Sequence, residues 1–205
     1  DSPLSVLKYF LKNEEYNGFK HYIVFQRAYE EAVILGLELQ GIDINDDRVI
    51  LLRRNTPEYI DLMLRAKYLL TDSTFQNFFV KKPEQIYINT WHGTPLKYMG
   101  YAMPNGVIGS WNVMRNFFMS DYLVSPNEHT TNVYLNDYML NGSYTGKITQ
   151  FGYPRNDVFF GDNQNELLKQ YLIDNYHIDG SKKILVFAPT WTEKQTKGNT
   201  LDIDR

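Results

Sequence analysis

The sequence contains no cysteine, which excludes disulfide bonds, thiolate nucleophiles and cysteine-ligated metal sites and leaves the redox compartment open. A basic excess is also missing: the formal net charge is −3, which argues against a nucleic-acid-binding protein. No apolar run is long enough to cross a bilayer. The chain opens on Asp1-Ser2-Pro3 without an initiator methionine or a basic leader, so we interpret it as a piece of a longer protein.

Motifs of several common enzyme classes are missing as well. Neither the glycine-rich loop of ATP-binding proteins nor that of dinucleotide-binding proteins occurs, so we expect no cofactor. The four histidines show no metal-ligand spacing, so we expect no zinc site. Asp72 and Asp121 stand alone rather than as a close acidic pair, which argues against glycosidase chemistry.

The sequence does contain enough apolar material for a core, with 43% hydrophobic and 15% aromatic residues. Strand-like apolar runs alternate with segments of helical periodicity, and this alternation predicts a parallel, doubly wound α/β sheet of the Rossmann-like class. We expect helices over 4–12, 28–40, 58–67, 113–119, 128–140 and 166–176, and strands over 21–25, 48–52, 68–71, 85–88, 122–125, 147–151 and 183–187. Thr56 with Pro57 is expected to start the third of these helices, and Asn127 to cap the fifth. Residues 98–111 contain three glycines and a proline, which predict an irregular surface loop.

The most informative stretch is Asn89-Thr90-Trp91-His92-Gly93-Thr94-Pro95-Leu96-Lys97, which directly follows the strand expected at 85–88. Imidazole changes its charge near neutral pH, so His92 is a candidate general base. Glycine beside it permits close approach of a ligand, and Pro95 fixes the direction in which the chain leaves. The alternative is a strand end closed by a turn, in which His92 is hydrogen-bonded to a backbone carbonyl group.

Polar or small residues follow four of the expected strands, at Asp72, His92, Ser125 and Gly152. In parallel α/β sheets the carboxyl ends of the strands lie along one edge, and ligands bind in the crevice beyond that edge. We therefore expect these four positions to gather at one edge and to form a site.

Four segments resemble the signature of a known family, in the family's order. They are Thr-Trp-His-Gly-Thr-Pro-Leu-Lys at 90–97, Asp-Tyr-Leu-Val-Ser-Pro-Asn at 121–127, Gly-Tyr-Pro-Arg-Asn-Asp at 152–157 and Leu-Val-Phe-Ala-Pro-Thr-Trp at 185–191. The family is that of the CDP-glycerol glycerophosphotransferases, which prime and polymerise teichoic acids in Gram-positive bacteria. The resemblance covers roughly residues 68–192, and Thr192 stands where the family usually carries an arginine.

The resemblance implies transfer of glycerol phosphate from CDP-glycerol, or of a similar group from a related CDP-polyol, to a hydroxyl of a polyol-phosphate or glycan acceptor, with release of CMP. It implies that His92 is the catalytic base, and Lys97 and Arg155 are the candidate cations for the phosphates. The alternative for Arg155 is an ion pair with Asp157 that shapes a turn, and Asn156 and Asp157 are themselves typical of a turn. We expect the substrate-binding residues to be Asp72, Ser73, Trp91, Gly93, Thr94, Lys97, Asn127, Gly152, Arg155, Asn156 and Asp157.

The resemblance also implies the GT-B arrangement, in which two Rossmann-like domains face a cleft. We expect residues 1–19 to be a linker or upstream helix, 20–160 the acceptor-side domain, 161–181 a connecting helix, and 182–205 the start of a truncated donor-nucleotide domain. Because the family's second catalytic histidine and its CDP pocket lie beyond Arg205, we expect this piece to be inactive alone. Two other functions stay open, a GT-B glycosyltransferase that uses a nucleotide sugar and a non-catalytic polymer-binding module.

We expect the protein to act in the cytoplasm, where nucleotide-activated donors are made. Any attachment to the inner face of the cell membrane is expected to be peripheral, through amphipathic stretches such as residues 4–12 or 98–111.

Overall fold

The computed structural model describes residues 1–160, 166–179, 181–183, 185 and 187. The chain divides into two compact units, Asp1–Gln164 and Asn165–Arg205. The strand expected over residues 183–187 is described only in part, and the tail with Trp191 lies outside the described residues. The domain boundaries expected from the sequence stay predictions.

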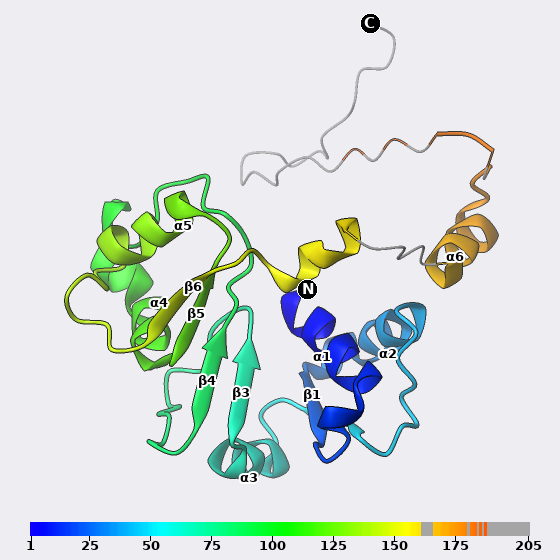
Figure 1. Ribbon diagram of the computed structural model, residues 1–205, viewed down its shortest axis with the longest axis horizontal. Helices are drawn as coiled ribbons and strands as arrows, with labels where there is room; N and C mark the ends of the chain where they lie inside the picture. Colours follow the sequence, from blue (N-terminus) through cyan, green and yellow to red (C-terminus); the bar gives the residue numbers. More distant parts are fainter. Residues whose placement is uncertain (161–165, 180, 184, 186, 188–205) are drawn as a thin grey trace, which may run out of the picture. The chain divides into compact units, whose positions relative to one another are not determined.

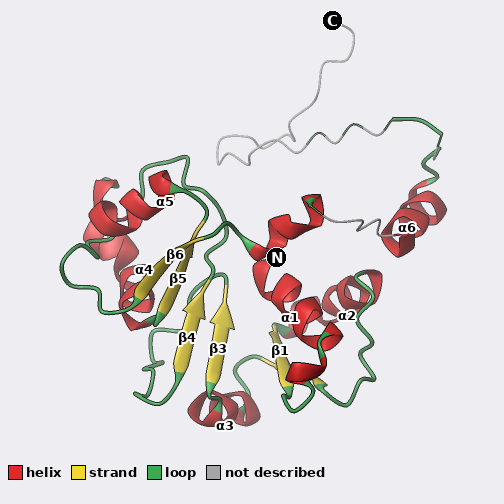
Figure 2. Cartoon of the chain, in the orientation of Figure 1, coloured by secondary structure: helices red, strands yellow, loops and turns green. Residues whose placement is uncertain are grey.

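All strand pairs of the first unit are parallel, which confirms the predicted α/β class (Figures 1 and 2). The strands form two sheets rather than the single one expected from the sequence. The smaller sheet pairs β1 (His21–Phe25) with β2 (Val49–Arg53), and the larger has β3 (Tyr68–Thr71), β4 (Ile86–Asn89), β5 (Tyr122–Ser125) and β6 (Lys147–Gln150). Strand order in the larger sheet follows chain order, without the reversal of a doubly wound sheet among the described strands.

Two helices, α1 (Ser2–Lys12) and α2 (Glu30–Leu39), accompany the smaller sheet. Their apolar faces build a core with the strands, whose buried members are Leu7, Leu37, Ile42 and Val49. The Asp1 carboxylate caps α1 by accepting from the backbone N–H of Leu4 at 2.8 Å. Residues 4–12 are therefore helical as expected, and this helix is packed into a core rather than free.

Helix α3 (Pro57–Arg65) begins where the sequence predicts. The Thr56 hydroxyl accepts from the Tyr59 N–H at 3.2 Å, and Pro57 occupies the first turn, where no N–H partner is needed. Tyr59 and Met63 then pack against Leu69 of β3 and Tyr87 of β4. This contact joins α3 to the larger sheet.

Helix α4 (Gly106–Met119) is longer than expected, because residues 106–111 were predicted to be irregular. Two of the three glycines that suggested a loop, Gly100 and Gly106, lie in close backbone contacts instead. A Cβ atom on Gly106 would lie 2.4 Å from the carbonyl oxygen of Gly100, in the short 3-10 helix Gly100–Ala102. The glycine thus allows the first turn of α4 to pack directly on that segment.

Helix α5 (Glu128–Asn132) continues into a π-helix, Val133–Asp137. The expected continuous helix to residue 140 therefore ends early, and Met139 adopts a left-handed conformation with φ 60°. As expected, Asn127 caps α5: its Oδ1 accepts from the Thr130 N–H at 2.9 Å. In the second unit, α6 (Glu166–Tyr176) matches the predicted helix.

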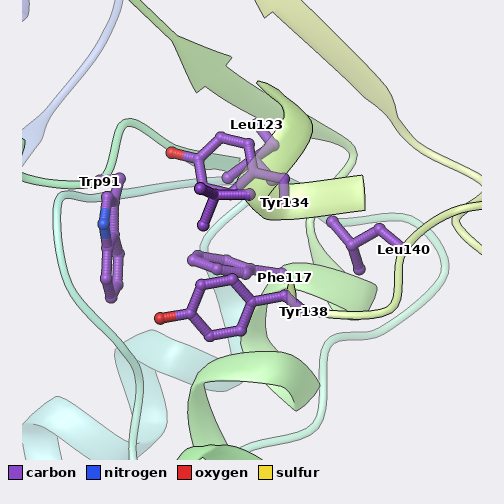
Figure 3. Packing of buried hydrophobic residues seen from close by; sticks show 7 residues of the cluster. Trp91, Phe117, Leu123, Tyr134, Tyr138 and Leu140 are labelled. Atoms are coloured by element: carbon purple, nitrogen blue, oxygen red, sulfur yellow. The ribbon is translucent and has the colours of Figure 1, made fainter. Parts of the chain in front are cut away.

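Helix α4, the π-helix and β5 enclose the most aromatic core of the first unit (Figure 3). Its buried members are Trp91, Phe117, Leu123, Val133, Tyr134, Tyr138 and Leu140. None of the helices in the described ranges combines the length and the apolar character needed to span a membrane.

Candidate functional site

The carboxyl ends of the four parallel strands β3 to β6 meet at one edge of the larger sheet, as predicted. The segments that leave this edge contact one another: the 89–97 loop (the histidine loop) touches residues that follow β3, β5 and β6. The structure therefore brings together most of the residues that the sequence singled out.

His92 lies in the histidine loop at this edge of the sheet, and its side chain is exposed. Its ring Nδ1 is 2.8 Å from the carbonyl oxygen of Asp72, the residue that follows β3. A carbonyl oxygen can only accept, so Nδ1 carries the hydrogen and Nε2 of the neutral ring is left with a free lone pair. This is the contact with a backbone carbonyl that the sequence offered as the alternative to catalysis, and it fixes the orientation of the ring.

Trp91 is placed differently from the expected substrate contact. Its side chain is 5% exposed and packs edge-to-face on Phe117 and Tyr138, with centroid distances of 5.0 and 6.5 Å (Figure 3). Its other neighbour is the ring of His92, with a centroid distance of 4.0 Å. Trp91 therefore supports the histidine loop from the core side.

Arg155, which follows β6, is hydrogen-bonded to the histidine loop. Its Nη1 donates to the carbonyl oxygen of His92 at 2.8 Å, and its guanidinium lies 4.9 Å from the ring centroid of Tyr153. No ion pair with Asp157 is found among the described residues, so the expected alternative for Arg155 is not the one adopted. Gly152, with φ 91°, provides a turn that other residues would adopt only under strain.

Gly93 lies next to this cation. A Cβ atom at Gly93 would be 3.8 Å from Nη2 of Arg155, so the absence of a side chain leaves the guanidinium accessible from the loop. The pKa of Tyr153 is raised chiefly by burial, so its hydroxyl stays neutral beneath the guanidinium.

Helix α5 holds the far end of the histidine loop. Asn127 Nδ2 donates to the Thr94 hydroxyl at 3.3 Å, and Nε2 of His129 lies 2.9 Å from the carbonyl oxygen of Pro95. Asn127 and Thr94 were expected at the site, whereas His129 was not. Its position two residues after Asn127 was the available signal.

Three other predicted residues contribute less to the assembled site. Lys97 is exposed on the loop beyond Pro95. Asn156 and Asp157 lie in the 3-10 helix Pro154–Phe159 and contribute backbone contacts there, as expected for turn residues: the Asn156 N–H donates to the Tyr153 carbonyl at 2.9 Å.

Ser73 enters through its backbone, whose carbonyl accepts from Asn89 Nδ2 at 2.9 Å. Asp121 precedes β5 and pairs with Lys81 at 2.9 Å, at the opposite end of the sheet from Asp72. The two acids therefore do not form a pair. No group of three potential metal ligands is found in the part of the chain that the structure describes.

The whole sequence matches one family. The family described as CDP-Glycerol:Poly(glycerophosphate) glycerophosphotransferase matches residues 1–205. A teichoic acid poly(glycerol phosphate) polymerase of Bacillus subtilis (strain 168) is 31% identical over 165 residues, which are 75% of this chain and 21% of that protein. A polymerase of the same description from Bacillus spizizenii is 28% identical over 202 residues, 94% of this chain and 46% of that protein.

A teichoic acid glycerol-phosphate transferase of Staphylococcus aureus is 31% identical over 140 residues, 65% of this chain and 35% of that protein. The fold is similar to that of the wall teichoic acid polymerase TagF, with a TM-score of 0.72 and 25% identity, covering 94% of this chain and 44% of that one. The chain thus spans less than half of the length of each of these relatives.

Proposed function

This chain belongs to the family of CDP-glycerol:poly(glycerophosphate) glycerophosphotransferases, and we propose that the protein transfers glycerol phosphate from CDP-glycerol to a hydroxyl of a teichoic-acid-like polymer. In this reaction the acceptor oxygen attacks the phosphorus that carries glycerol. The bond from that phosphorus to the CMP oxygen breaks, and CMP leaves. The proton of the acceptor hydroxyl has to be taken up as the new bond forms.

The observation that carries the proposal is the contact between His92 Nδ1 and the Asp72 carbonyl. It leaves Nε2 as the basic nitrogen on the exposed side of the ring, where an acceptor hydroxyl can reach it. A neutral imidazole can accept a proton from a hydroxyl group near neutral pH. His92 is accordingly the general base of the proposed reaction.

Positive charge for the phosphates comes from Arg155 and Lys97. One guanidinium nitrogen of Arg155 is engaged by the His92 carbonyl, and the remaining N–H groups can bind a phosphate oxygen. Gly93 leaves them room on the loop side. The Arg155 cation is thereby held beside the segment that carries the base, so that donor phosphate and acceptor hydroxyl can be aligned with each other.

The direct test is transfer activity of the full-length protein with CDP-glycerol, CDP-ribitol and UDP-sugars. We expect CMP release that depends on the acceptor and on CDP-glycerol or a related CDP-polyol. Turnover of a UDP-sugar with none of a CDP-polyol would favour a glycosyltransferase. Binding of the polymer with no turnover of any donor would favour a non-catalytic module.

A second part of the proposal concerns location at the cytoplasmic face of the cell membrane. Of the two amphipathic stretches, α1 buries its apolar face in the core around Leu7. Apolar residues at the end of the histidine loop and beyond it are exposed instead: Leu96 is 94% exposed and Ile108 is 84% exposed, with Tyr98 and Trp111 also exposed. Such a surface beside the site supports peripheral attachment next to a membrane-bound acceptor.

A further inference from the structure

A wholly buried amide lies at the end of β4, where the histidine loop begins. Asn89 is 0% exposed, and its side chain makes three hydrogen bonds. Nδ2 donates to the carbonyl oxygen of Ser73 and to the hydroxyl of Tyr87, both at 2.9 Å, and Oδ1 accepts from the Trp91 N–H at 2.9 Å. An amide in the core has to be satisfied in this way, because an unpaired polar group there is costly.

The two backbone groups that Asn89 binds are neighbours of the two partners in the His92 contact. Ser73 follows Asp72, whose carbonyl accepts from the imidazole, and Trp91 precedes His92. A single side chain thus joins the two segments on which the histidine and its acceptor stand. Together with the backbone bond from the Thr90 N–H to the Thr71 carbonyl at 2.9 Å, this bridge holds the two segments next to each other.

The bond to Trp91 has a second effect, on the backbone. Trp91 adopts φ 51°, a left-handed conformation that a bulky residue enters only when its surroundings compensate. Acceptance of the N–H two residues ahead by an asparagine side chain is the Asx-turn, which stabilises such a bend. The bend directs the indole of Trp91 into the core and leaves His92 exposed above Asp72.

A buried network of hydrogen bonds also supports the side chain of Asn89, through the hydroxyl of Tyr87. The Tyr87 hydroxyl accepts from Asn89 and donates to Oδ1 of Asn116 at 3.1 Å, and that oxygen also accepts from the Phe75 N–H at 2.8 Å. Burial raises the pKa of Tyr87, so its hydroxyl keeps the proton that it donates. Asn116, also 0% exposed, lies on α4 and binds Phe75 rather than the histidine loop.

We propose that Asn89 is a positioning residue, which holds His92 in the tautomer and orientation needed for proton transfer by clamping Ser73 and Trp91. The proposal deepens the function proposed above and rests on it. Asn89 is enclosed by protein and makes no contact with substrate, so its effect on the reaction passes through His92.

Asn116 offers a matched control, since it is an equally buried asparagine in the same network. Asn89→Ser removes the bond to Ser73, because the shorter side chain cannot reach it, and Asn89→Leu removes all three bonds while keeping the volume. Asn116→Ser removes contacts to Phe75 and leaves the clamp on the histidine loop intact. All three variants should lower the melting temperature, so stability alone does not separate them.

Nitrogen-15 NMR of the imidazole in the full-length protein separates them, with the His92 signals identified by their loss in His92→Gln. We expect the Nδ1–H tautomer in the wild type and in Asn116→Ser, and a shift towards the Nε2–H tautomer in both Asn89 variants. In parallel, kcat should fall by about 10- to 100-fold in Asn89→Ser with KM for CDP-glycerol within about threefold, whereas Asn116→Ser should keep kcat within about threefold.

Two results would overturn the proposal. One is a wild-type protein in which His92 is mainly the Nε2–H tautomer; this measurement does not depend on the folding of any variant. The other is an Asn89→Ser protein whose tautomer and kcat match those of Asn116→Ser. A tautomer shift confined to the Asn89 variants, in a protein that transfers no glycerol phosphate, would support the positioning role of Asn89 and overturn the proposed reaction alone.

Discussion

Arg155 Nη1 lies 2.8 Å from the carbonyl oxygen of His92, although 63 positions separate the two residues in the chain. The segment after β6 is thereby tied to the segment after β4 at the edge where the sheet opens. The proposed phosphate-binding cation and the proposed base are thus held next to each other without either side chain neutralising the other, because the contact uses a backbone oxygen.

Replacement of His92 should abolish most turnover and leave the fold intact. Loss of a general base typically costs about 10²- to 10⁴-fold in rate, and we expect His92→Ala and His92→Gln to lose activity within that range. The glutamine amide can still donate to the Asp72 carbonyl but accepts no proton at neutral pH. CMP release under conditions where chemistry limits the rate is the measurement, and a glutamine variant within a few-fold of wild type would rule out the base.

Arg155→Lys should recover little of the activity lost in Arg155→Ala. Lysine keeps the charge but not the planar fork that binds the His92 carbonyl and a phosphate oxygen together. We expect kcat/KM for CDP-glycerol to fall about 10- to 100-fold in both variants, measured by steady-state kinetics. Arg65→Ala is the control, because Arg65 is an exposed residue of α3 paired with Asp61. Equal activity of Arg155→Lys and wild type would show that charge alone matters.

Gly106→Ala should destabilise the protein, whereas Gly109→Ala, in the same helix, should stabilise it. A Cβ atom at residue 106 would meet the Gly100 backbone at 2.4 Å, and such overpacking costs about 1–3 kcal/mol in the free energy of unfolding. Nothing lies within 4 Å of a Cβ atom at residue 109, where alanine gains about 0.5–1 kcal/mol as a helix former. Denaturant unfolding measures both, and shifts of the same sign would contradict the close packing of α4.

Stability should fall in two steps as the pH is lowered. The pKa of His21 is lowered, chiefly by burial and then by the nearby Arg48 charge. The stabilisation that the neutral imidazole contributes is therefore present above about pH 6.5 and is lost as the pH falls below that value. Hydrogen bonds from Arg48 lower the pKa of Asp46 to about 2, so its contribution is present above about pH 4 and is lost as the pH falls towards 2. Melting temperatures between pH 2 and 8 test both windows.

Two variants assign those steps. His21→Phe should remove the step below pH 6.5, because phenylalanine does not titrate. It can also keep the stacking on Phe10, whose ring centroid lies 5.8 Å from that of His21. Asp46→Asn should remove the acid step and leave the other. A step below pH 6.5 that persists in His21→Phe would assign it to another group.

Binding to anionic vesicles should depend on the exposed apolar residues at the end of the histidine loop and beyond it. We expect the full-length protein to float with such vesicles at low salt, and the double change Leu96→Ser and Ile108→Ser to reduce the bound fraction several-fold. Tyr29→Ser, at an exposed aromatic residue before α2, is the control. Flotation that is unchanged by the double substitution would exclude this surface as the attachment site.

Local signals allowed much of the fold to be predicted from the sequence. The Thr56-Pro57 start of α3 and the Asn127 cap of α5 depend on nearest neighbours in the chain, and both are confirmed. Helix α4 was predicted too short because Gly100 and Gly106 read as breakers, whereas their role is a contact between two segments. The division of the strands into two sheets depends likewise on long-range pairing, which alternation along the chain does not specify.

The candidate site was predicted in outline for a similar reason. That His92 and Asp72 would share an edge follows from parallel strands, and the structure places them in contact. The burial of Trp91 and the clamp by Asn89 were not foreseen, because a left-handed bend at residue 91 decides which way each side chain points. A bend of this kind is fixed by hydrogen bonds that only the folded chain reveals.

The packing of Trp91 on Phe117 and Tyr138 has a genetic consequence. Because the indole fills a core position while its neighbour His92 is the proposed base, the core and the proposed chemistry share one short peptide. Temperature-sensitive alleles that lose activity before they lose the protein should therefore cluster at Phe117 and Tyr138. Second-site suppressors of such alleles should arise in α4 and the π-helix, which form the other wall of that core.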